Sequence, residues 1–144
     1  MDNKKFLLVD DDYEDIELFA EAVESIDAGV ACLNATHGRD ALDKLTGQAI
    51  QKPDIIFLDI NMPVMNGWQF LRKLKEMEEL KEIPVIMYST SSKRSDMNTA
   101  MSSGALCFFT KPDNYHRLKK ILEIVLAHME NGKLSQVCDA IQKA

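Results

Sequence analysis

The chain lacks long apolar runs, linkers and low-complexity segments. It has 144 residues, the size of one ordinary domain. Its N-terminal apolar run, residues 6–9, is far too short for the core of a signal peptide. No stretch approaches the length that spans a bilayer. These absences predict a single globular domain in a cytoplasmic location, with no membrane partner.

The chain also lacks an excess of basic side chains. Its formal net charge is −6, with 46% hydrophobic and 28% charged residues. Non-specific binding to nucleic acid or to an anionic membrane surface needs a basic face. We therefore expect neither a nucleic acid nor a membrane among the partners.

Cysteines are few and lie far apart, at Cys32, Cys107 and Cys138. There is no CxxC pair, and cysteine and histidine never fall at the spacing of a zinc site. The three histidines are also too scattered to support a shared metal site. An odd number of cysteines without an export signal indicates reduced thiols.

Short apolar runs alternate with stretches whose apolar side chains recur at helical spacing. The runs predict five buried strands, and the stretches between and after them predict five helices. A Ser/Thr cluster, residues 89–92, is a candidate N-cap for the fourth helix, and Gly104 fits its C-terminal cap. Strict alternation predicts an α/β fold, a doubly wound parallel sheet with helices on both faces. The strands are expected at 6–9, 30–35, 54–58, 85–88 and 106–109, and the helices within 16–26, 41–49, 68–77, 97–101 and 118–129.

The last stretch follows a helix-stop pair at residues 131–132. Leu134, Val137, Cys138 and Ile141 then recur at helical spacing. We predict a domain over 1–129 and a C-terminal tail over 130–144, for which a short amphipathic helix is the candidate structure. A tail that folds back on the domain or frays is favoured over a dimerisation or partner helix, because short helices are weak alone.

Polar side chains gather where the predicted strands end. The first strand is followed by Asp10 and Asp11, the third by Asp59 and the fifth by Lys111, and the fourth ends in Ser89. Ligands of an open parallel sheet bind beyond the carboxyl ends of its strands. These five side chains are therefore expected to converge.

Carboxylates in close contact either share a proton or hold a cation. A hard cation with oxygen ligands, most simply Mg²⁺, suits such a cluster, and one carboxylate can then attack phosphorus. Lys111 adds a positive charge, and the Ser89 hydroxyl adds a donor. A single aspartate after a strand is usually only a helix N-cap, which is the interpretation given to Asp12 and Asp15.

Four segments together resemble the receiver domains of two-component response regulators. They are residues 6–11, 56–63 with the turn pair Asn66-Gly67, 84–89, and 104–112. The resemblance covers about residues 5–129, and the chain is similar to small stand-alone receivers of the CheY-like superfamily. It implies a flavodoxin-like fold with strand order 2-1-3-4-5 and a possible short extra C-terminal helix.

The resemblance implies a phosphorylation site with Mg²⁺ as cofactor. Asp59 matches the phosphoryl acceptor, and Asp11 matches a direct metal ligand. Asp10 matches the carboxylate that acts through a metal-bound water. Asn61 matches the position whose backbone carbonyl binds the metal.

The resemblance also implies a switch. Lys111 matches the lysine that contacts a phosphoryl oxygen, and Ser89 matches the hydroxyl that turns toward the phosphoryl group. Phe108 matches the aromatic switch position. The bond between Lys111 and Pro112 matches a peptide that is usually cis.

The implied function is to accept a phosphoryl group from a histidine kinase or phosphotransfer protein. This would switch the surface of the fourth helix, fifth strand and fifth helix toward a downstream protein or a second copy. Such a protein is a phospho-acceptor switch rather than an enzyme, with only Mg²⁺-dependent self-phosphorylation and slow autodephosphorylation.

Two alternatives remain open. The start of the chain also fits a haloacid-dehalogenase-like phosphatase, with Asp10 as nucleophile and Asp12 as general acid. Against this alternative, no late acidic pair follows Lys111 and there is no cap domain. The second alternative is a phosphorylation-independent binding module on the same fold.

Overall fold

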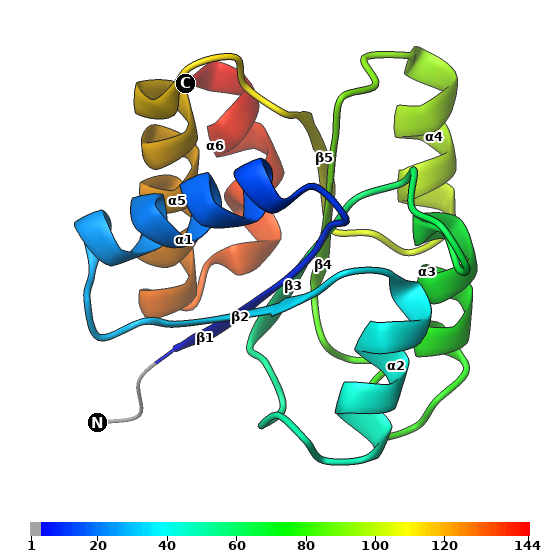
Figure 1. Ribbon diagram of the computed structural model, residues 1–144. Helices are drawn as coiled ribbons and strands as arrows, with labels where there is room; N and C mark the ends of the chain where they lie inside the picture. Colours follow the sequence, from blue (N-terminus) through cyan, green and yellow to red (C-terminus); the bar gives the residue numbers. More distant parts are fainter. Residues whose placement is uncertain (1–3) are drawn as a thin grey trace.

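A five-stranded, all-parallel sheet forms the centre of the computed structural model, which describes residues 4–144. The first three residues of the predicted domain 1–129 lie outside the described residues. The strand order β2-β1-β3-β4-β5 confirms the predicted fold (Figure 1). The strands are β1 (Lys5–Val9), β2 (Ala31–Ala35), β3 (Ile55–Leu58), β4 (Val85–Ser89) and β5 (Cys107–Thr110).

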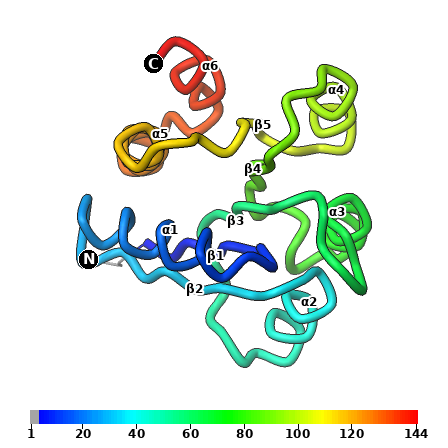
Figure 2. Tube along the Cα trace, turned by 45° about the horizontal axis from the view of Figure 1, so that its top comes forward, coloured from blue at the N-terminus to red at the C-terminus, as the bar shows by residue number. Residues whose placement is uncertain are grey.

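Helices cover both faces of the sheet, with one apolar core on each face (Figure 2). Successive strand residues point to opposite faces, so Phe57 enters one core and Leu58 the other. Both faces of β3 are buried, which explains its continuous apolar sequence. One face carries α1 (Tyr13–Ile26) and α5 (Tyr115–Glu130), and the other carries α2 (Gly38–Thr46), α3 (Gly67–Lys75) and α4 (Arg94–Ser102).

The start of α4 differs from the prediction. Its N-cap is Lys93, which makes no side-chain cap hydrogen bond. Within the Ser/Thr cluster, the Ser91 hydroxyl instead donates to Asp96 and accepts from the Lys93 N–H, so it ties the loop to the helix without being the cap residue. Gly104 follows α4 with φ 95°, a left-handed conformation that glycine adopts without strain, as its predicted cap role requires.

Two helices also end earlier in the sequence than their apolar spacing predicted, and one apolar side chain is less buried than expected. Ala49 lies beyond the end of α2, and Met77 lies beyond α3. Met101, expected to face inward, is half exposed on α4. Apolar spacing therefore continues past the ends of α2 and α3, and on α4 it includes a side chain that is half exposed.

The C-terminal segment folds back on the domain, as expected for a short amphipathic helix. A 3-10 turn, η1 (Leu134–Gln136), leads into α6 (Val137–Lys143), which lies beside α5 and β5 (Figure 1). Val137 and Ile141 are buried. Packing therefore stabilises a helix too short to be stable alone.

Cys107 of β5 and Cys138 of α6 form a disulfide, which corrects the expectation of reduced thiols for this pair. Their Cα atoms are 5.2 Å apart, well within the usual range for a disulfide. The prediction failed because the two residues are 31 positions apart in sequence, and only the return of α6 brings them together. Cys32 remains a free thiol.

The peptide before Pro112 is also different from the expectation. Residues 4–144 contain no cis peptide bond, so the bond between Lys111 and Pro112 is trans. The two isomers before proline differ by only about 0.5–1 kcal/mol, so sequence alone does not decide between them. None of the helices within residues 4–144 is both long and apolar enough to cross a membrane.

Candidate functional site

The backbone of the site is held by the sheet itself. The N–H groups of Asp10, Asp59 and Lys111 each donate to a carbonyl of the neighbouring strand, at 3.0, 3.0 and 2.7 Å. The parallel ladder thus continues one residue beyond β1, β3 and β5. These residues therefore lie at one edge of the sheet, as the sequence predicted.

Three carboxylates come together at this edge. One carboxylate oxygen from each of Asp10, Asp11 and Asp59 lies within 4.8 Å of the others. Asp10 is fully buried and Asp59 nearly so, whereas Asp11 is exposed. Two buried carboxylates and one facing solvent make an acidic pocket that opens outward.

The Lys111 ammonium sits among carboxylates. Its Nζ is 2.7 Å from Asp10 Oδ2, 2.8 Å from Asp15 Oδ2 and 3.5 Å from Asp59 Oδ2. The same nitrogen lies 5.3 Å from the centre of the Tyr88 ring. Lys111 therefore reaches the pocket, as predicted, and is not a solvated surface lysine.

The two aspartates interpreted as helix caps have different roles. Asp12 is the N-cap of α1, and its side chain accepts from the N–H groups of Glu14 and Asp15. Asp15 caps nothing with its side chain, which instead contacts Lys111. The capping interpretation is thus confirmed for Asp12 and wrong for Asp15, because a contact across 96 positions leaves no local signal in the sequence.

Burial shapes the ionisation of the pocket. Burial raises the pKa of Asp10 to about 6, although the contact with Lys111 opposes this. Burial also raises the pKa of Asp59, again against the Lys111 ammonium. Burial alone would lower the pKa of Lys111, but the contacts with Asp10 and Asp15 outweigh it, so that pKa is raised. Lys111 remains charged, while the carboxylates are ionised at a cost.

The pocket suits a hard divalent cation. Asp10 Oδ2 is buried and accepts no well-directed hydrogen bond from the described residues, and its 2.7 Å approach to Lys111 is an ion-pair contact. Negative charge exceeds positive charge at this edge. Oxygen ligands of this kind are those that Mg²⁺ prefers, often with waters completing its shell.

Ser89, Phe108 and Asn61 lie at different distances from this edge, because Ser89 ends β4, Asn61 follows β3 in a loop and Phe108 lies within β5. Ser89 is buried at the end of β4, and its Oγ accepts from the Ser91 N–H at 3.3 Å. Phe108 lies in β5 with its ring in the core on the α4 side. Asn61 is exposed, two residues after Asp59. The switch roles of Ser89 and Phe108 and the metal role of Asn61 remain predictions.

The loop after β3 passes very close to the backbone of Asp59. A Cβ atom at residue 67 would collide with the carbonyl oxygen of Asp59, and the Gly67 N–H donates to Ile60 O at 2.8 Å. Asn66 and Gln69 form a capping box that starts α3. The pair predicted as a turn is thus a helix start, in which glycine permits close backbone contact.

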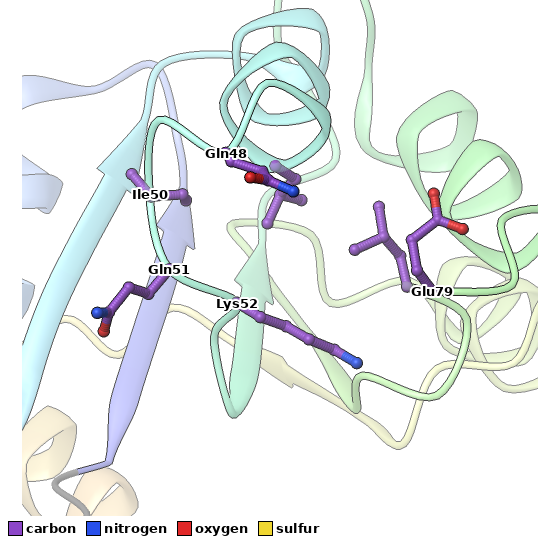
Figure 3. Close-up of a pocket in the computed structure, with 7 residues that line it drawn as sticks. Gln48, Ile50, Gln51, Lys52 and Glu79 are labelled. Atoms are coloured by element: carbon purple, nitrogen blue, oxygen red, sulfur yellow. The ribbon is translucent and has the colours of Figure 1, made fainter.

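A separate cavity of about 470 Å³ lies at the other end of the sheet (Figure 3). The loops before β3 and β4 form it, with Lys52 and Glu79 among its lining side chains. It contains no carboxylate cluster comparable to the acidic pocket. The chemically equipped site is therefore the pocket at the carboxyl ends of the strands.

Comparisons with known proteins give one family. A family model, the response regulator receiver domain, matches residues 6–123. Chemotaxis protein CheY1 of Helicobacter pylori is 37% identical over 94 residues, which are 65% of this chain and 74% of CheY1.

Two solved structures are also similar. The phosphorylated cyanobacterial phytochrome response regulator RcpA superposes with TM-score 0.81 at 29% identity, covering 88% of this chain and 94% of RcpA. The Mn²⁺-bound form of response regulator Rcp1 gives TM-score 0.78 at 26% identity, with the same coverage of 88% and 94%.

Proposed function

The chain belongs to the response regulator receiver family, whose role is phospho-acceptor signalling, and we propose that Asp59 is the residue that receives its phosphoryl group. One observation carries this assignment. Asp59 is the carboxylate at the central strand end that shares a pocket with both acidic partners and the Lys111 ammonium. A nucleophile there has a cation site on one side and a fixed positive charge on the other.

In the proposed reaction an Asp59 carboxylate oxygen attacks phosphorus, and the bond from phosphorus to the donor breaks. Asp11, Asp59 and the Asn61 carbonyl would hold Mg²⁺, with Asp10 acting through a water. The bound ion would neutralise charge on the transferred group. Lys111 donates a hydrogen bond to a phosphoryl oxygen, which favours the charge spread over the transition state.

The proposed output starts at Ser89 and Phe108. The phosphoryl group adds negative charge and acceptor oxygens, which the Ser89 hydroxyl turns to meet. The loop after β4 moves inward with Ser89 and leaves room for the Phe108 ring. The conformational equilibrium of the surface formed by α4, β5 and α5 then shifts. In this structure α6 covers part of α5 and β5, so the surface open to a partner includes α6.

The proposed partners follow from the chemistry. A histidine kinase or phosphotransfer protein supplies the phosphoryl group, and a downstream protein or a second copy of the chain receives the signal. Beyond switching, the chain carries only Mg²⁺-dependent self-phosphorylation and slow autodephosphorylation. We assign the acceptor chemistry to residues 1–129 and structural support of β5 and α5 to residues 130–144.

The test is phosphorylation with acetyl phosphate and Mg²⁺, followed by intact-mass measurement. The wild type should gain one phosphoryl group per chain, and Asp59→Asn should gain none. Asp54→Asn, at an exposed aspartate that precedes the same strand, is the matched control and should be labelled like the wild type. Equal labelling of Asp59→Asn and the wild type would end the assignment.

The geometry of the site argues against the phosphatase alternative. Asp10 would be its nucleophile, but that side chain is fully buried, with Oδ1 accepting from the Asp12 N–H at 3.0 Å. Its general acid, Asp12, caps α1. Catalytic turnover of a phosphate monoester would support that alternative, whereas one stable label on Asp59 excludes it. The binding-module alternative predicts unchanged partner binding by Asp59→Ala.

A further inference from the structure

Asp15 lies beside the acidic pocket, but the proposed function gives it no role there. It stands in the first turn of α1, and its side chain is about a quarter exposed, at 28%. Its Oδ2 accepts a hydrogen bond from Lys111 Nζ at 2.8 Å, nearly as short as the 2.7 Å contact between Lys111 and Asp10. A carboxylate on a helix therefore holds the ammonium that reaches Asp59.

The Lys111 ammonium carries three N–H donors, and its nitrogen lies within 3.5 Å of three carboxylates. Two of these have other tasks in the proposed function: Asp10 serves the metal through a water, and Asp59 becomes modified. Asp15 is not part of the cluster that could hold a metal ion. It can therefore keep its contact with Lys111 throughout phosphoryl transfer.

We propose that Asp15 is a positioning residue, which anchors the Lys111 ammonium from α1 so that one N–H remains aimed at the phosphoryl group on Asp59. This inference rests on the proposed function and extends it to a residue outside the four segments that carry the resemblance. The first turn of a helix favours a negative side chain there, because the helix dipole is positive at its N-terminus. Lys111 thus gains an anchor that does not depend on the metal.

Charge alone predicts the opposite effect of removing Asp15. A nearby carboxylate repels an incoming phosphoryl group, so a neutral residue should tighten binding if repulsion were its only influence. If Asp15 positions Lys111, a neutral residue should weaken binding, but only while Lys111 is present. The sign of the effect, with and without the lysine, separates the two roles.

The experiment measures the affinity for beryllofluoride, a phosphoryl mimic, in excess Mg²⁺ by ¹⁹F NMR. The proteins are wild type, Asp15→Asn, Lys111→Met and the double variant. Glu14→Gln is the matched control, because Glu14 lies in the same helical turn, is exposed and forms no ion pair within residues 4–144. Melting temperatures confirm that each variant is folded.

We expect Asp15→Asn to weaken binding about tenfold in the presence of Lys111, as double-mutant couplings of contacting charges allow. In the Lys111→Met background the same change should have no effect or should tighten binding. Glu14→Gln should bind as the wild type does, and Asp15→Glu, which keeps charge and acceptor, should recover most of the affinity. If Lys111→Met does not fold, the affinity of Asp15→Glu decides whether Asp15 positions Lys111.

Equal or tighter binding by Asp15→Asn would overturn the proposal, as would equal weakening in both backgrounds. Failure of the wild type to bind beryllofluoride would instead contradict the proposed function itself. Weakening by Asp15→Asn that still higher Mg²⁺ abolishes would overturn the proposal too, because it would assign Asp15 to the metal and not to Lys111.

Discussion

The two ends of β5 differ in almost every physical respect. At its start, Cys107 is buried and joined to α6 by the disulfide to Cys138. Just beyond its end, Lys111 lies among ionisable carboxylates. One end is held by apolar packing and a covalent bond, and the other by charges whose burial is costly.

The energetic consequences have opposite signs. Burying the Val137 and Ile141 side chains stabilises the fold by about 1.5–3 kcal/mol each. Burying the Asp10 and Asp59 carboxylates raises their pKa values, which means that ionising them in the folded protein costs free energy. We infer that this strand separates stability from chemistry, so that changes at one end should leave the other largely intact.

The largest expected effect is loss of the disulfide. Replacing Cys107 and Cys138 by alanine should lower the free energy of unfolding by about 3–4 kcal/mol, because a link between residues 31 positions apart restricts the unfolded chain. Urea unfolding of the oxidised wild type and the double variant measures this difference. The phosphoryl label on Asp59 should be unchanged, because Lys111 does not depend on α6 for its contacts.

Two controls sharpen that comparison. Reduction of the wild type should give the same loss of stability as the double variant, and Cys32→Ala should respond to reduction as the wild type does. Burial raises the pKa of Cys32 to about 11, so its thiolate is scarce at neutral pH and it should not exchange into the disulfide. A folded double variant that accepted no phosphoryl group would show that the two ends are coupled.

The contrast between the two ends of β5 also explains which parts of the structure could be predicted from the sequence. Strands such as β3, buried on both faces, appear as unbroken apolar runs, and a parallel sheet brings its carboxyl ends to one edge. Those two rules were enough to place Asp10, Asp11, Asp59 and Lys111 together. They act on backbone geometry, which short sequence patterns encode directly.

The remaining features depend on how side chains meet after folding. The Asp15 contact with Lys111 and the disulfide each join residues from separate elements, at positions where a local interpretation was available: a helix cap and a free thiol. Gly67 was interpreted as a turn residue because the collision it avoids, with Asp59 O, exists only once the loop is folded. Local patterns compete with such long-range contacts and give no measure of them.

A smaller effect, of opposite sign, is expected at the acidic end. In metal-free protein near pH 8, Asp10→Asn should raise the free energy of unfolding by on the order of 2 kcal/mol, because it removes a buried carboxylate that is costly to ionise. The same change should weaken Mg²⁺ binding. Chemical unfolding in EDTA measures the change in stability of the metal-free protein. The same unfolding in excess Mg²⁺ without EDTA measures the change in Mg²⁺ binding.

The pH dependence gives this prediction its sign. The pKa of Asp10 is about 6 in the folded protein, compared with an ordinary value of 3.8, which we take for the unfolded chain. Between these two pH values the folded protein therefore binds more protons than the unfolded chain does. Wild-type stability should therefore fall as pH rises from about 4 to 6, and the advantage of Asp10→Asn should grow over that window. Part of the fall should persist in the variant, because the pKa of Asp59 is also raised. A variant less stable than the wild type at pH 8 would contradict this.

The smallest expected effect separates structure from chemistry within the acidic end itself. Asp12 accepts hydrogen bonds from two N–H groups of α1, so Asp12→Ala should cost about 1 kcal/mol of stability, while Asp12→Ser should keep the cap and most of that free energy. Neither change should abolish the phosphoryl label on Asp59, which intact mass after acetyl phosphate treatment records. If Asp12→Ser were as stable as the wild type yet took up no phosphoryl group, Asp12 would be part of the chemistry. The reacting carboxylates would then include Asp12, one residue beyond Asp10 and Asp11, and would not end where the geometry of the pocket indicates.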